Sequence, residues 1–88
     1  MYTIKFSVEA QKDVIKLQNR SPEALKKLIK LLPELREHPR SGTGKVERLK
    51  HYTQETWSRR LTKEHRVVYR IDDYVVEVLV ISAFGHYE

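Results

Sequence analysis

The spacing of hydrophobic residues changes from a helical period to an alternating one part-way along the chain. After a short alternating segment at 2–6, apolar residues recur every three or four positions as far as residue 35, and from residue 46 onward they alternate. A period near 3.6 indicates an amphipathic helix, and a period of two indicates a half-buried strand. The pattern predicts an α+β fold of order β-α-α-β-β-β, with two amphipathic N-terminal helices packed on one face of a small antiparallel β-sheet.

Two start signals divide the helical region. Ser7 is a candidate N-cap for a helix ending near residue 20, and Ser21-Pro22 supplies a second cap followed by a proline at the first helical position. Pro33 removes one backbone hydrogen bond, so we expect a kink or break there. The face expected to be buried in the first helix consists of residues at helical spacing, Val8, Gln11, Val14, Ile15 and Gln18. In the second helix the expected apolar stripe is Leu25, Leu28, Ile29, Leu32 and Leu35.

The second half of the chain supplies the remaining strands, which we expect at 46–50, 56–62, 65–71 and 74–82. Alternation places Val67, Tyr69 and Ile71 on the core side of their strand. Arg66 and Arg70 then lie on the open face, which the helices do not cover. Arg59 and Arg60 are consecutive and point to opposite faces, so at least one of them joins this open face.

Composition excludes several classes of protein. With 88 residues the chain forms one domain, 1–88, and without cysteine it has no disulfides, thiolate metal sites or cysteine nucleophile. It contains neither a run of about 20 apolar residues nor a signal-peptide pattern, so we expect a cytoplasmic protein with no membrane partner. The net charge of +5 is uneven: +3 over 1–39, +6 over 40–70 and −4 over 71–88. Concentrated positive charge favours a phosphate-bearing partner or, equally, a solubilising surface.

The titratable residues of the second half suggest an acid–base site. Glu47 lies in a segment rich in cations, which alone would favour an ordinary surface ion pair. A glutamate, an arginine and the C-terminal His86 are together the set that metal-free RNA cleavage requires: a base for the 2′-OH, a cation for the phosphorane and an acid for the leaving 5′ oxygen. The four histidines have no i, i+4 pairing, so we expect no metal and no cofactor. His65 is expected to be buried and hydrogen-bonded.

Three segments carry a resemblance to a known family. They are GKVERLKH at 44–51, WSRRLTKEHRVVY at 57–69 and the terminal His86-Tyr87. Together they resemble the YoeB/Txe family, ribosome-dependent mRNA-cleaving toxins of type II toxin–antitoxin systems within the RelE/ParE superfamily. The match covers nearly the whole chain, and the family's fold, two helices on a microbial-ribonuclease-like sheet, agrees with the predicted order. Phe84-Gly85 and the additional Glu88 depart from the family's usual C-terminus.

The resemblance implies a role for each residue of the site. Glu47 would be the general base, Arg66 the phosphate-stabilising cation and His86 the general acid. Tyr87 would position the substrate, and Lys50 and Arg59 would be supporting cations. The implied partners are the ribosome with its mRNA and a cognate antitoxin, YefM/Phd-like or similar, whose acidic C-terminal segment covers the basic surface. A homodimer or a toxin–antitoxin hetero-oligomer is expected.

Two other functions remain open from the residues alone. One is a non-catalytic toxin of the same fold that poisons DNA gyrase, as in the ParE branch. Such a protein has no need of the glutamate and the histidine. The other is a plain RNA-binding module, which usually displays stacking aromatic side chains on its strands. Trp57 and Tyr69 instead have the pattern of packed residues.

Overall fold

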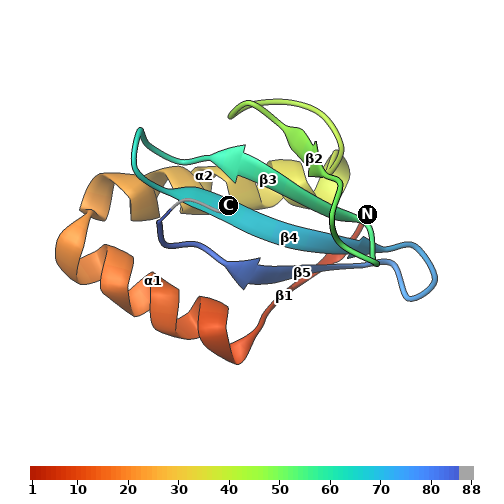
Figure 1. The fold of residues 1–88 in the computed structure, drawn as a ribbon, viewed down its shortest axis with the longest axis horizontal. Coiled ribbons are helices and arrows are strands. Elements are labelled where there is room, and N and C mark those ends of the chain that lie inside the picture. Colours follow the sequence, from red (N-terminus) through yellow and green to blue (C-terminus); the bar gives the residue numbers. More distant parts are fainter. Residues whose placement is uncertain (86–88) are drawn as a thin grey trace.

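Helices form where the hydrophobic residues recur with a helical period, and strands form where they alternate (Figure 1). The computed structural model describes residues 1–85, in which one strand is followed by two helices and then by four strands. The strands are β1 (Thr3–Phe6), β2 (Glu47–Leu49), β3 (Thr56–Arg60), β4 (Arg66–Asp72) and β5 (Glu77–Ser82), and the helices are α1 (Val8–Arg20) and α2 (Pro22–Glu37). The predicted succession of one strand, two helices and then strands is confirmed, but four strands follow the helices where β-α-α-β-β-β has three.

The strands form one mixed sheet of order β1-β5-β4-β3-β2, with both helices packed on the same face (Figure 1). Strands β2 to β5 pair antiparallel with their neighbours, as predicted. β1 instead runs parallel to β5, with Ile4 opposite Val78, so the sheet is not wholly antiparallel. Two parallel neighbouring strands require a long crossover connection, and the connection from β1 to β5 includes both helices. Alternation within β1 does not reveal which strand it will join.

α1 begins where predicted but buries a different face. Ser7 caps the helix, its Oγ accepting a hydrogen bond from the Ala10 N–H at 3.0 Å. The buried residues are Ala10, Asp13 and Leu17, whereas Val8 and Ile15 of the expected stripe are exposed. A small alanine lets the helix backbone approach the sheet closely. Asp13 turns inward because its Oδ2 accepts a hydrogen bond from the Ala83 N–H at 3.0 Å.

α2 passes through Pro33 without a break. The proline lies on the exposed side of the helix, so water can solvate the carbonyl four residues earlier that loses its N–H partner. Leu28, Leu31 and Leu35 are buried on either side of the proline and hold the helix against the sheet. Leu31 takes the buried position that the sequence pattern gave to Ile29, which is exposed.

The core lies between the helices and the sheet. Val67, Tyr69 and Ile71 of β4 point into it, as predicted from alternation, and Val78 and Val80 of β5 join them. β5 therefore occupies an interior position between β1 and β4, in keeping with its strongly apolar sequence. Within residues 1–85 no helix has the length and apolar content needed to cross a membrane.

The predicted strand at 74–82 begins three residues late. Residues 74–76 belong to the turn between β4 and β5 and are exposed, the side chain of Tyr74 almost entirely at 99%. The Asp72 carboxylate organises the turn by accepting hydrogen bonds from the N–H groups of Tyr74 and Val75, at 2.9 and 3.3 Å. This local side-chain bonding outcompetes the strand pattern of the apolar residues.

Candidate active site

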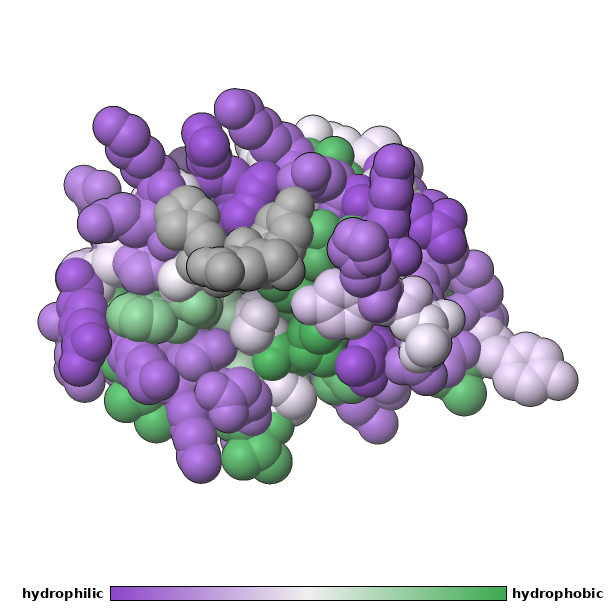
Figure 2. Space-filling view, in the orientation of Figure 1, coloured by the Kyte–Doolittle hydropathy of each residue, from purple (hydrophilic) through white to green (hydrophobic). Residues whose placement is uncertain are grey.

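The face of the sheet opposite the helices, termed the open face, carries Glu47. β2 pairs with β3 so that Glu47 is opposite Ser58 and Leu49 is opposite Thr56. Glu47 and Leu49 thus share the open face. Leu49 is buried there, and Lys50 follows in an exposed turn at the end of the strand. In the orientation of Figure 1, hydrophilic side chains gather around β2 and β3, beside a small hydrophobic area (Figure 2).

Arg66 lies next to Glu47, although the two residues are far apart along the chain. Arg66 opens β4, and its Nη2 lies 3.5 Å from Oε1 of Glu47. The Arg66 side chain is 10% exposed and that of Glu47 is 53% exposed. Burial fixes the direction of the guanidinium, and exposure leaves the carboxylate accessible to a substrate. The structure therefore brings together the two described residues that were predicted to act as base and phosphate-binding cation.

The prediction that Arg59 binds substrate is wrong. Its side chain is fully buried on the helix side of the sheet, where Nη1 forms an ion pair with Oε1 of Glu34 at 2.6 Å. Nε donates to the Tyr69 hydroxyl at 3.0 Å. The other donors bind backbone carbonyls of His38, Ser41 and Thr43. Strand pairing causes this placement, because Arg59 is opposite the core residue Val67. Arg59 shapes the loop that leads into β2.

Arg60 takes the place on the open face that Arg59 does not. It lies directly opposite Arg66 in the pairing of β3 with β4, and it is partly buried. Its Nε is buried and has no hydrogen-bond partner among residues 1–85, and the same is true of the Ser58 Oγ one pleat away. Alternation alone required one of the two arginines to face outward. The pairing of 56–60 with 66–70 identifies which one.

The C-terminal segment reaches the site beside Arg66. The Arg66 N–H donates to the Gly85 carbonyl at 3.0 Å, and the Gly85 N–H donates to Nδ1 of His65 at 2.9 Å. His65 is 8% exposed, which confirms the prediction of a buried, hydrogen-bonded histidine. The predicted acid His86 and the predicted positioning residue Tyr87 lie outside the described residues.

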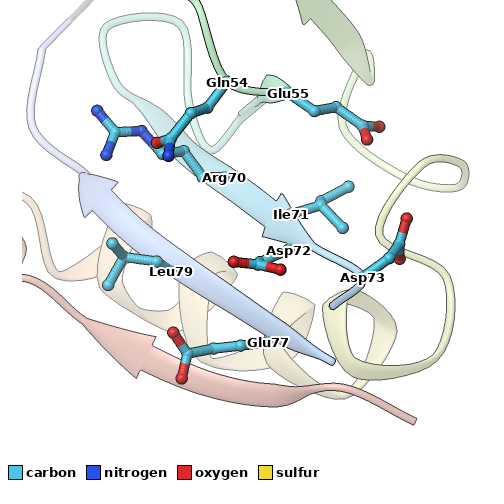
Figure 3. Close-up of a pocket in the computed structure, with 8 residues that line it drawn as sticks. All are labelled: Gln54, Glu55, Arg70, Ile71, Asp72, Asp73, Glu77 and Leu79. Atoms are coloured by element: carbon cyan, nitrogen blue, oxygen red, sulfur yellow. The ribbon is translucent and has the colours of Figure 1, made fainter. Parts of the chain in front are cut away.

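A hollow of about 470 Å³ with a mainly acidic lining lies beside Arg70 on the same sheet. Figure 3 shows the Arg70 guanidinium on one side of it and the carboxylates of Asp72 and Asp73 on the other. Its full lining is Gln54, Glu55, Arg70, Ile71, Asp72, Asp73, Glu77 and Leu79. Carboxylates repel phosphate, so this end of the sheet does not favour an anionic ligand.

Ion pairs in the fold account for the shifted pKa values. Bidentate hydrogen bonds from Arg40, at 2.6 and 2.9 Å, lower the pKa of Glu55 to about 2. Hydrogen bonds from Tyr2 and Arg40 likewise lower the pKa of Asp73. Burial raises the pKa of Glu34, but hydrogen bonds from Thr43 and Arg59 outweigh burial, so the net shift is downward. These carboxylates are therefore anionic partners that hold loops, rather than candidate proton carriers.

Two helices on one face of a mixed sheet, with a Glu–Arg pair on the other face, define a small toxin fold of the RelE type. The isolated RelE toxin of Escherichia coli superposes on the chain with a TM-score of 0.77 at 28% identity, covering 100% of this chain and 87% of that one. Residues 6–87 match the family described as the YoeB-like toxin of bacterial type II toxin-antitoxin systems. The protein belongs to this family.

Individual relatives agree with this assignment. Toxin YoeB of Escherichia coli K12 is 37% identical over 82 residues, covering 93% of this chain and 95% of that one. Among solved structures, a YoeB/ParE toxin from Agrobacterium tumefaciens has a TM-score of 0.86 at 30% identity, covering 97% and 99% of the two chains. The toxin of a heterotetrameric YoeB–YefM complex from Staphylococcus aureus has a TM-score of 0.79 at 33% identity, covering 99% of each.

Proposed function

We propose that the protein is a ribosome-dependent endoribonuclease toxin that cleaves mRNA in the ribosomal A site by metal-free acid–base chemistry and so inhibits translation. The observation that carries the proposal is the proximity of Glu47 and Arg66 on the open face. An exposed carboxylate can accept a proton from a substrate, and a buried guanidinium beside it can bind the phosphate whose charge increases during the reaction.

The proposed reaction has one proton acceptor and one proton donor. Glu47 takes the proton of a ribose 2′-OH, and the 2′ oxygen attacks the adjacent phosphorus. The bond from phosphorus to the 5′ oxygen breaks, and His86 gives its proton to that oxygen. The products are a 2′,3′-cyclic phosphate and a free 5′-OH. Arg66 stabilises the pentavalent phosphorane, and Tyr87 orients the substrate.

The supporting cations in this proposal are Lys50 and Arg60. Lys50 lies in the turn after β2, and Arg60 lies across the strand pair from Arg66. Lys50 is thus close to Glu47 along the chain, and Arg60 is close to Arg66 across the sheet. Either cation can bind the RNA backbone. Arg59 has no part in binding because it is fully buried.

The proposed regulator is a cognate antitoxin of the YefM/Phd type, bound in a hetero-oligomer. Two observations support it. A relative from Staphylococcus aureus forms a YoeB–YefM heterotetramer. The cations around Glu47 provide a surface that an acidic segment would complement. The protein is proposed to act in the cytoplasm, where ribosomes are found.

Purified protein added to mRNA-programmed ribosomes tests the proposal. Wild type should cut the mRNA, and Glu47→Gln should slow cutting by about 10²–10⁴-fold, the usual contribution of a general base. Glu64→Gln makes the same change at an exposed glutamate in the turn between β3 and β4, and it should cut at the wild-type rate. Intact mRNA with wild type, or an unchanged rate for Glu47→Gln, would refute the assignment.

The gyrase-poisoning alternative gives the opposite pattern in the same set of variants. It leaves mRNA intact, inhibits DNA supercoiling by gyrase, and does not depend on the Glu47 carboxylate acting as a base. Running a supercoiling assay beside the ribosome assay separates the two functions directly.

A further inference from the structure

The consecutive residues His65 and Arg66 bind both backbone hydrogen-bonding groups of Gly85, which follows β5 near the C-terminus. Gly85 donates its N–H to Nδ1 of His65 at 2.9 Å and accepts from the N–H of Arg66 at 3.0 Å. A backbone N–H is always a donor, so Nδ1 of His65 must be an acceptor.

The His65 ring is itself held firmly. Its side chain is nearly buried, and its ring packs on that of Phe84 with the centroids 4.7 Å apart at 40°. Its carbonyl accepts hydrogen bonds from the N–H groups of Leu61 and Thr62, at 2.9 and 3.2 Å, which fixes the turn between β3 and β4. Nδ1 thus occupies a defined position relative to the start of β4.

α1 holds the same segment from the other side. Asp13 accepts a hydrogen bond from the Ala83 N–H at 3.0 Å. The centroid of the Phe84 ring lies 5.5 Å from Lys16 Nζ and 5.9 Å from Cζ of the Arg20 guanidinium. Each of the three consecutive residues 83 to 85 therefore contacts another part of the fold. Gly85 has φ +78°, a conformation that suits glycine, and a Cβ there would meet no atom within 4 Å. Glycine is needed for its backbone conformation and not for space.

We propose that His65 is a positioning residue that holds Gly85, the residue before His86, beside Arg66. This inference rests on the proposed function, in which His86 is the general acid. His86 is joined to Gly85 by one peptide bond, and Arg66 binds the phosphate in that proposal. The hydrogen bond from Gly85 to His65 thus fixes the starting point of the acid relative to the cation. An error of about 1 Å in such a placement can cost about 10²-fold in rate.

Two substitutions of His65 separate its acceptor from its ring. His65→Phe keeps an aromatic ring on Phe84 but leaves the Gly85 N–H without an acceptor. His65→Asn loses the ring but places Oδ1, an acceptor, close to the position of Nδ1. Single-turnover cleavage on programmed ribosomes should show kcat falling about 10–100-fold for His65→Phe, with KM within twofold of wild type. His65→Asn should recover most of that loss.

Two further variants complete the design. Gly85→Ala leaves His65 intact and opposes the left-handed backbone conformation, so it should lower kcat in the same way. His38→Phe makes the His65→Phe change at an exposed histidine and should behave as wild type. Wild-type kcat for His65→Phe, or equal losses for His65→Phe and His65→Asn, would overturn the inference.

Amide hydrogen exchange at Gly85, measured by NMR on the free protein, is a readout that does not require activity. Gly85 should exchange slowly in wild type and His65→Asn, and at least tenfold faster in His65→Phe. If wild type fails to cleave mRNA while hydrogen exchange follows this order, the proposed function is refuted but His65 still holds Gly85. If wild type cleaves mRNA while His65→Phe has the wild-type exchange rate and the wild-type kcat, the positioning role of His65 is refuted and the proposed function is retained.

Discussion

Neighbouring arginines in β3 should respond in opposite ways to the same substitution. Arg59 makes five side-chain hydrogen bonds in a fully buried position. Lysine has three donors on one atom and cannot reproduce the planar fork, so Arg59→Lys leaves at least two acceptors without a partner. Hydrogen bonds to charged groups contribute about 1.5–3 kcal/mol each, and disrupting a buried ion pair costs about 3–5 kcal/mol. We expect a loss of about 3–5 kcal/mol in the free energy of unfolding.

That loss is large for a domain of this size. A chain of 88 residues has a free energy of unfolding of about 4–13 kcal/mol at the usual value per residue. Arg60→Lys, by contrast, should change the free energy of unfolding by less than about 1 kcal/mol, because Arg60 lies on the open face and forms no ion pair among residues 1–85. It should instead slow mRNA cleavage by about tenfold, since lysine binds phosphate as a point charge only.

Urea unfolding followed by tryptophan fluorescence measures both variants. Trp57 is the single tryptophan of the chain and lies in the same strand as both arginines. The free energy of unfolding should fall for Arg59→Lys alone. A wild-type midpoint for Arg59→Lys together with a destabilised Arg60→Lys would mean that β3 is displaced by one residue relative to β4, and it would refute the reasoning. The ribosome assay on the same two proteins gives the complementary result.

Two other predictions concern stability. The pKa of Glu55 is lowered to about 2 by Arg40, so its stabilising effect is complete above the unfolded value near 4.5 and disappears as the pH falls from there to about 2. The pKa shift sets an upper limit of about 3 kcal/mol on the stabilisation by this ion pair, and solvent screening around the partly exposed Arg40 reduces it to about 1–2 kcal/mol. Glu55→Gln should lower the free energy of unfolding by that amount near neutral pH and make it depend less on pH between about 4.5 and 2, as measured by urea titration. Val76 has φ +55°, so Val76→Gly should gain about 0.5–1 kcal/mol in thermal unfolding, whereas Val75→Gly should gain nothing.

The sequence was sufficient for those parts of the fold that depend on local periodicity. Alternation placed Val67, Tyr69 and Ile71 in the core and Arg66 on the open face, because each strand has only two faces. The start of each helix followed from serine and proline signals that act within one turn. The proximity of Glu47 and Arg66 follows only from the sheet order, in which β3 lies between β2 and β4 and pairs with both.

Features that depend on distant partners could not be read from the pattern. Asp13 is buried because the Ala83 N–H reaches it from the far end of the chain. The parallel pairing of β1 with β5 is likewise a long-range choice. The exposed apolar turn at 74–76 formed because the Asp72 carboxylate bonds the local backbone, which a hydrophobicity pattern does not register.

The positive charge of the middle segment divides between the fold and the open face. Residues 40–70 carry a net +6, but Arg40 is paired with Glu55 and Asp73, and Arg59 is paired with Glu34. These two arginines stabilise loops and cannot also release counterions from RNA. Without these two, seven of the nine cations in the segment are left, so electrostatic attraction to phosphates is weaker than the charge count implies. Part of the positive charge of the middle segment therefore stabilises the fold and is not available to a phosphate-bearing partner.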